Sequence, residues 1–200
     1  MKLYFSKGAC SLAVRIVINE IGIDCEYEKV NLKTKVTASE HDFLKINSKG
    51  SVPALELDNK EVLTENSVIQ QYLADNYQAT TLLPPVPDFK RYRVLEWLNY
   101  VSTEIHKGFS PLFNDKIPDA VKQEIFIPNL QKKFSFLNEH LENKKFIMGE
   151  NFSLPDAYLF VMLVWAEKMK IALTDKKALS RYYEELQQRE SIKKSLREEE

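Results

Sequence analysis

The sequence predicts an α+β unit followed by an all-helical unit. Over the first 78 residues, short strand-type apolar runs alternate with helical patterns, whereas after residue 88 the strand-type runs disappear. Between them, residues 79–88 contain Pro84, Pro85 and Pro87, which do not fit inside a helix. We interpret residues 79–88 as an interdomain linker, which assigns residues 1–78 to the first unit and residues 89–200 to the second.

The first unit is expected to have the order β-α-β-α-β-β-α. Lys2 to Phe5 is a short apolar run typical of a strand, and Val14, Val17, Ile18 and Ile21 recur on one face of a helix that Gly22 would end. The remaining elements are a strand at 25–32, a short helix at 39–46, a hairpin formed by 52–57 and 61–63, and a helix through 69–76.

The second unit is expected to be a helical bundle. Apolar residues recur at helical spacing over 94–105 and 126–141, and residues 157–166 are apolar on every side, which predicts a buried central helix. Ser153 and Asp156 have the spacing of an N-terminal capping box for that helix. Residues 175–187 and 190–198 are helical in pattern and increasingly polar, and the final glutamates are expected to form a solvated tail.

Composition excludes several classes of partner. The 200 residues carry 28 basic and 29 acidic side chains, a net charge of −1, so we expect no nucleic-acid partner and no anionic membrane surface. The longest uncharged apolar run has about half the length that a membrane-spanning helix needs, and no export signal is visible. We therefore expect a cytosolic protein with reduced cysteines, and the scattered histidines and cysteines predict no metal site.

Cys10 and Ser11 lie where the first strand passes into the first helix. A helix start carries unpaired amides and a partial positive charge, which favour a thiolate. A small buried hydrophobic residue is an equally good interpretation of Cys10 from its position alone. Position 13 is Ala, so a Cys-x-x-Cys reaction would lack its second thiol. Cys25 is expected within a strand, in the core.

Two further segments have both a binding and a structural interpretation. Val52-Pro53 is either a cis-proline turn that leaves the Val52 backbone free for a peptide-like ligand, or an edge-strand proline. Glu65 and Asn66, at the start of a helix, could hold the charged groups of an α-amino acid, although helix capping by Asn66 is the more common role.

A polar stripe follows the long helix of the second unit. Asn99, Thr103 and His106 recur at i, i+4 and i+7 beside the apolar face, with Lys107 next in sequence. A solvated helix face is one interpretation. Such faces are usually charged and this stripe is mostly neutral, which favours a buried polar site.

Taken together, these residues resemble the glutathione S-transferase superfamily, and most closely its bacterial beta class. The resemblance spans the chain: MKLYFSKGACSLAVRIVINE, INSKGSVPALELDN, LTENSVIQQYLAD, EWLNYVSTEIHKGFSPLF and FSLPDAYLF. It implies a thioredoxin-like first domain, a helical-bundle second domain that contributes the pocket for the second substrate, and a homodimer. Position 66 departs from the family pattern, because Asn stands where Ser, Ala or Gly is more frequent.

The resemblance also implies roles for individual residues. Cys10 matches the beta-class cysteine at the glutathione sulfur, and Ser11 and His106 complete the expected catalytic set. The expected glutathione contacts, besides Cys10, are Lys35, Val52, Pro53, Glu65, Asn66, Asn99, Thr103, Glu104, Ile105, His106 and Lys107. The second-substrate pocket is expected to use Phe109, Phe113 and Trp165.

The function that follows is conjugation of the glutathione thiolate to small hydrophobic electrophiles, with glutathione as co-substrate and no metal. Two alternatives stay open. One is a glutathione-dependent thiol-disulfide oxidoreductase that uses Cys10, and the other is a non-catalytic interaction protein with the same fold.

Overall fold

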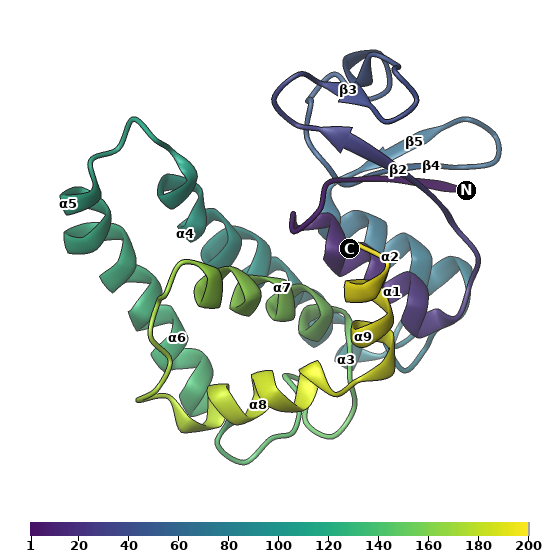
Figure 1. Ribbon diagram of the computed structural model, residues 1–200. Helices are drawn as coiled ribbons and strands as arrows, with labels where there is room; N and C mark the ends of the chain where they lie inside the picture. Colours follow the sequence, from purple (N-terminus) through teal and green to yellow (C-terminus); the bar gives the residue numbers. More distant parts are fainter. Residues whose placement is uncertain (200) are drawn as a thin grey trace. The chain divides into compact units, whose positions relative to one another are not determined.

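The computed structural model describes residues 1–199 and divides the chain into two compact units (Figure 1). The first comprises Met1–Leu83 together with Arg189–Glu200, and the second comprises Pro84–Gln188. The helical unit was predicted to extend through residue 200, so the last twelve residues differ from expectation.

The first unit is built on a five-stranded mixed sheet in the order β3-β2-β1-β4-β5. Its strands are β1 (Lys2–Phe5), β2 (Glu26–Asn31), β3 (Val36–Thr37), β4 (Ala54–Glu56) and β5 (Val62–Thr64). The central β1 pairs in parallel with β2 and antiparallel with β4. Helices α1 (Ser11–Ile21) and α2 (Asn66–Asn76) lie together on one face of the sheet (Figure 1). This is the predicted α+β fold.

Three features of this unit differ from the predictions made from local sequence patterns. The expected helix at 39–46 is a single 3-10 turn, Phe43–Lys45, and the short strand β3 was not predicted. Cys25 lies one residue before β2 and is half-buried, so it is neither within a strand nor in the core. Short edge segments depend on pairing with a neighbouring strand, which local patterns do not reveal.

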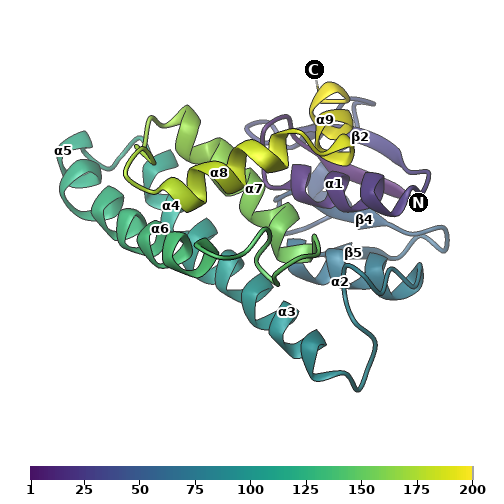
Figure 2. The ribbon, with the colours of Figure 1, turned by 90° about the horizontal axis from the view of Figure 1, so that it is seen from below.

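The final helix, α9 (Glu190–Arg197), packs along α1 (Figures 1 and 2). Ile192 is fully buried there, and the Asn19 side-chain amide donates to Ser195 Oγ at 2.9 Å. The prediction of a solvated glutamate tail is wrong for Glu199, which is only 7% exposed, whereas Glu198 is exposed and Glu200 lies outside the described residues. The Glu199 carboxylate has partners on and before α1, which a sequence pattern cannot show.

The second unit is all-helical, as predicted. Its principal helices are α3 (Phe89–Tyr100), α6 (Ile127–Leu141), α7 (Leu154–Lys168) and α8 (Lys177–Gln187), with the short turns α4 (Lys107–Phe109) and α5 (Asp119–Val121). Two π-helical segments, Val101–His106 and Lys122–Phe126, and a 3-10 turn, Ser110–Phe113, interrupt this pattern. No helix among residues 1–199 is long and apolar enough to span a bilayer.

Helix α7 forms the core of the second unit, and its start confirms the predicted capping box. The Asp156 carboxylate accepts from the Ser153 amide at 2.8 Å and from Ser153 Oγ at 2.7 Å. It also accepts from the Ile147 amide and from the Tyr182 hydroxyl, both at 2.8 Å. Four donors therefore satisfy a carboxylate that is completely buried.

Candidate functional site

Cys10 occupies the position immediately before α1, where the thiol lies at the start of a helix. No side-chain hydrogen bond caps this helix start, and no acidic residue lies in its first turn. The thiol is 9% exposed and donates to the Val52 carbonyl oxygen at 3.4 Å. The helix therefore presents its N-terminal dipole to a thiol rather than to a capping side chain.

Val52 and Pro53 form the second predicted segment of the site. The Val52-Pro53 peptide bond is cis, as the first of the two interpretations expected. Pro53 precedes β4 and lies outside the strand. The backbone of Val52 thus faces the Cys10 thiol, although the two residues are 42 positions apart in sequence.

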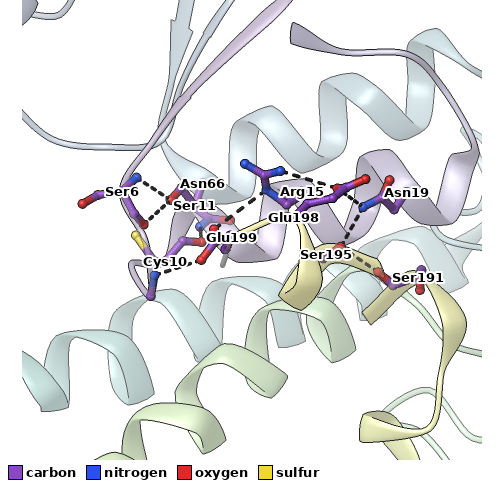
Figure 3. A network of polar contacts seen from close by, with 11 residues as sticks. Ser6, Cys10, Ser11, Arg15, Asn19, Asn66, Ser191, Ser195, Glu198 and Glu199 are labelled. Carbon is purple, nitrogen blue, oxygen red and sulfur yellow. Dashed lines mark hydrogen bonds and ion pairs between the residues drawn. The ribbon is translucent and has the colours of Figure 1, made fainter. Parts of the chain in front are cut away.

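Asn66 ties α2 to the Cys10 segment (Figure 3). Its side-chain amide donates to the Cys10 carbonyl oxygen at 2.6 Å. Its side-chain oxygen accepts from Gln70 Nε2 at 2.6 Å. Asn66 is 6% exposed and is the first helical residue rather than the cap. Asn66 is therefore not the helix cap, and its side chain belongs to an internal network.

Glu65 precedes α2 and is exposed, with a φ of 71°. A positive φ in a residue with a Cβ is strained, and such residues are concentrated at functional sites. The carboxylate accepts from Lys49 Nζ at 2.6 Å, in a pair that is open to solvent. The unusual backbone of Glu65 is a signal that sequence reasoning did not provide.

Two other predicted residues of the first unit have internal partners. Lys35 Nζ donates to the Gly50 carbonyl oxygen at 2.6 Å, so this side chain is half-buried against the loop before Val52. Ser11 is fully buried, and its Oγ accepts from the Ser6 amide at 3.3 Å and donates to the Ser6 carbonyl at 3.4 Å. Ser11 therefore closes the turn that carries Cys10, and its hydroxyl does not face solvent.

Cys25 differs from Cys10 in its surroundings. Burial raises the pKa of the Cys25 thiol to about 11, and the thiol donates to the Glu26 carbonyl at 3.3 Å. A thiol with so high a pKa is almost entirely protonated at neutral pH. The two cysteines are both reduced in the structure.

In the second unit, the predicted polar stripe does not form a buried site. Asn99 and Thr103 are exposed, and Thr103 Oγ1 donates to the Asn99 carbonyl at 3.1 Å. The expected spacing assumed an α-helix, whereas Val101–His106 is π-helical and hydrogen-bonds at longer spacing. A π-helical turn is itself frequent at functional sites.

The neighbours of His106 on this segment point in different directions. Glu104 and Lys107 are exposed, and the Glu104 carboxylate forms an ion pair with Lys133 at 2.8 Å. Ile105 is fully buried, so its side chain belongs to the core of the second unit and is not available to a ligand.

His106 is the member of the stripe with a protected environment. Its Nδ1 forms a short hydrogen bond with the hydroxyl of Tyr158, a residue that is 1% exposed. Burial, assisted by the charge of Lys107, lowers the pKa of His106 from 6.5 to about 4. The imidazole is therefore neutral at physiological pH.

The three residues expected to contact the second substrate form one aromatic group with His106. The ring of Trp165 lies 5.1 Å from His106, 5.6 Å from Phe109 and 4.9 Å from Phe113, each in an edge-to-face arrangement. Phe109 is fully buried and Trp165 nearly so, whereas Phe113 is 53% exposed. Phe113 is thus the accessible member, and Phe109 supports it from the core.

Sequence reasoning missed an aromatic cavity of about 480 Å³ in the second unit. Trp97 and Phe136 stack at 5.8 Å, and His140 lies 4.2 Å from Trp97. The remaining lining residues are Arg93, Glu96, Tyr100, Lys144, Ile147 and Met148. Among residues 1–199, no three histidine, cysteine or acidic side chains are grouped as metal ligands.

Comparison with known proteins agrees with this arrangement. Residues 1–75 match the N-terminal domain of glutathione S-transferase, and residues 100–190 match its C-terminal domain. Glutathione S-transferase GstA of Escherichia coli O157:H7 is 40% identical over 98% of this chain and 97% of its own length. Glutathione S-transferase GST-4.5 of Xanthomonas campestris is 32% identical over 93% of this chain and 92% of its own length.

Solved structures give the same result. A sphingomonad glutathione S-transferase complexed with glutathione has a TM-score of 0.95 and 38% identity, covering 100% of this chain and 98% of that chain. The bacterial beta-class enzyme of Sphingomonas chungbukensis has a TM-score of 0.95 and 37% identity, with coverage of 100% and 98%. This chain belongs to the glutathione S-transferase superfamily and is a transferase of the bacterial beta-class type.

Proposed function

We propose that the protein conjugates glutathione to small hydrophobic electrophiles. The observation that carries the proposal is the meeting of three distant segments at Cys10. The Cys10 thiol contacts the Val52 carbonyl, and the Cys10 carbonyl accepts from Asn66. These are the segments expected to bind the sulfur, the cysteinyl backbone and the γ-glutamyl end of glutathione.

In this proposal, the glutathione sulfur lies beside Cys10, and the Val52 backbone pairs with the cysteinyl residue. The exposed Glu65 carboxylate binds the γ-glutamyl ammonium, and the first backbone amides of α2 bind its carboxylate. Lys35 is proposed to attract the glycyl carboxylate from its place beside Gly50. Asn66 and Ser11 hold the segments in position through their internal hydrogen bonds.

The second unit is proposed to contact the electrophile. Phe113 offers an exposed ring supported by Trp165, and such apolar walls accept many substrates. The neutral His106 beside Trp165 offers a polar group within the same aromatic surroundings. Asn99, Thr103 and Lys107 are exposed and are proposed as polar contacts to glutathione, not to the electrophile.

The chemical step is a nucleophilic substitution. The amides and dipole at the start of α1 favour loss of the glutathione thiol proton to solvent, which leaves a thiolate. The thiolate sulfur forms a bond to the electrophilic carbon, and the leaving group, such as a halide, departs with its electron pair. Positioning and a lowered thiol pKa supply the acceleration.

A steady-state panel tests the proposal. Conjugation of an aryl halide is measured beside reduction of hydroxyethyl disulfide, with the wild type and with Cys10→Ala. We expect conjugation by the wild type that saturates with glutathione. An absence of conjugation with every electrophile, together with no retention on glutathione resin, would leave a non-catalytic interaction protein.

A second function, glutathione-dependent disulfide reduction, has its own supporting observation. Cys10 forms no disulfide and precedes a helix without a side-chain cap, and position 13 is Ala. A mixed disulfide on Cys10 would therefore wait for a second glutathione, whose thiolate attacks it and releases oxidised glutathione. Disulfide reduction that disappears in Cys10→Ala while conjugation persists would establish this second activity.

We also propose that the protein is a symmetric homodimer. Phe89 and Tyr92 of α3 are 66% and 52% exposed, and the aromatic cavity beside Trp97 opens on the same helix. Val68 of α2 and Tyr77 after it are exposed as well. Isologous pairing would cover such apolar surfaces, and it is the most common closed assembly. A monomeric mass in sedimentation at micromolar concentration would refute the homodimer.

A further inference from the structure

The turn that carries Cys10 is held from two sides. On one side, Ser11 binds the backbone of Ser6. On the other, the Gly8 amide donates to Glu199 Oε2 at 2.9 Å, across 191 positions of sequence. Gly8 has a φ of 70°, a conformation that suits glycine, and it lies two residues before Cys10.

The carboxylate that holds Gly8 is anchored in the interior of the first unit (Figure 3). Arg15, on α1, is 1% exposed and lies over the rings of Phe5 and Tyr27, at 4.4 Å and 3.7 Å. Its guanidinium pairs with Glu198 at 3.4 Å and with Glu199 at 3.9 Å. A buried cation requires anionic partners, so Arg15 fixes the place of both carboxylates.

Contacts between α9 and α1 fix the position of these two carboxylates along α1. At the beginning of α9, Arg189 and Ser191 bind the Glu20 carboxylate, and further along Asn19 donates to Ser195 and to Glu198. These contacts follow α1 from its last turn toward its first. Glu199 therefore arrives at the beginning of α1, beside the turn of Gly8.

We propose that Glu199 is a positioning residue for Cys10, which holds the turn before the thiol through the Gly8 amide. The proposal deepens the proposed function, because it takes Cys10 as the thiol of the glutathione site. Loss of this hydrogen bond would let the turn open and would expose a thiol that is now only 9% accessible.

Alkylation of Cys10 by iodoacetamide, without glutathione, tests the proposal by peptide mass mapping. In Glu199→Ala, we expect alkylation about tenfold faster than in the wild type, the order expected when a hydrogen bond to a charged acceptor is lost. Glu199→Gln keeps an oxygen acceptor for Gly8 and should react at the wild-type rate. Glu199→Asp keeps the charge but shortens the reach, and should react faster.

Glu198→Ala is the matched control, since Glu198 binds Arg15 and Asn19 but not the Gly8 turn. It should lower the thermal midpoint and leave alkylation of Cys10 unchanged. The proposal is overturned if Glu199→Asp reacts like the wild type while Glu199→Gln reacts faster, because the charge on Arg15 would then be the decisive feature. It is equally overturned if Glu198→Ala accelerates alkylation as much as Glu199→Ala.

The alkylation assay does not depend on glutathione chemistry. If the wild type failed to bind glutathione, the proposed function would fall, while the rates of the Glu199 variants would still decide the positioning role. If the protein conjugates glutathione and the Glu199 variants alkylate at the wild-type rate, the positioning role alone is rejected.

Discussion

Two helix starts in this protein are built in opposite ways. At the start of α7, the Asp156 carboxylate accepts four hydrogen bonds and is fully buried. At the start of α1, Cys10 makes no side-chain cap, and the first turn contains no acid. The N-terminal dipole therefore faces a capping box in one helix and a thiol in the other.

The two helix starts therefore serve different purposes, one in folding and one in binding. A fully satisfied helix start contributes to folding and offers nothing to a ligand, whereas an uncapped one forgoes that stabilisation and keeps its amides for binding. The start of α2 resembles that of α1, because Glu65 provides no side-chain cap and has a strained backbone. The starts of α1 and α2 both lie in the first unit, at the proposed glutathione site.

The largest expected effect is on disulfide formation by Cys10, at the start of α1. Incubation with oxidised glutathione should add one glutathionyl group per chain, and Cys10→Ala should abolish this adduct without a large change in stability. The reason is the place of Cys10 at a helix start, which favours the thiolate that undergoes disulfide exchange. Intact mass and peptide mapping make the measurement.

Cys25→Ala is the control for this experiment and should accept the adduct at the wild-type level. With a pKa of about 11, the Cys25 thiol should react appreciably only at strongly alkaline pH. An adduct found on Cys25, or one that persists in Cys10→Ala, would show that Cys10 is a packing residue.

The second prediction concerns the start of α7, where the Asp156 carboxylate accepts four hydrogen bonds. Asp156→Ala should lower the free energy of unfolding by about 4 kcal/mol, because it leaves several buried donors without an acceptor. Urea denaturation measures the change. Asp119→Ala, which removes an exposed first-turn carboxylate from α5, should change stability by about 0.5 kcal/mol or less. If both variants lost the same free energy of unfolding, the buried hydrogen bonds of Asp156 would not be what stabilises the start of α7.

The third prediction concerns His106. Its folded pKa of about 4 lies below the ordinary value of 6.5, so the unfolded chain binds a proton that the folded protein does not. Stability should therefore fall by about 2 kcal/mol as the pH drops from about 6.5 to about 4. His106→Gln should flatten this part of the pH profile, measured by urea denaturation at each pH.

The smallest expected effect concerns the start of α2. Glu65→Ala should weaken glutathione binding about tenfold, as expected for the loss of one hydrogen bond to a charged group. Stability should change little, because the Glu65–Lys49 pair is exposed. Isothermal titration compares this variant with Glu61→Ala, an exposed glutamate in the preceding hairpin. Identical glutathione affinities in all three proteins would exclude Glu65 from the site.

The sequence by itself determined the class of each unit, the strand at Lys2–Phe5, the helix end at Gly22 and the capping box at Ser153. These features depend on periodicity and on contacts between near neighbours in the chain, which a pattern records directly. The resemblance added the glutathione chemistry and the Cys10, Val52-Pro53 and Glu65 segments. The resemblance could not show the contact between the Cys10 thiol and the Val52 carbonyl.

Only the tertiary structure decided how distant side chains are used. Asn66 forms an internal hydrogen bond to Cys10, and Asn99 and Thr103 are exposed rather than buried. Glu199 is buried, where it contacts Arg15 and Gly8. From the sequence alone, a polar residue is predicted to be solvated or functional, because the partner that it meets in the interior lies far along the chain. Which polar groups are buried together depends on packing, and local propensity carries no record of it.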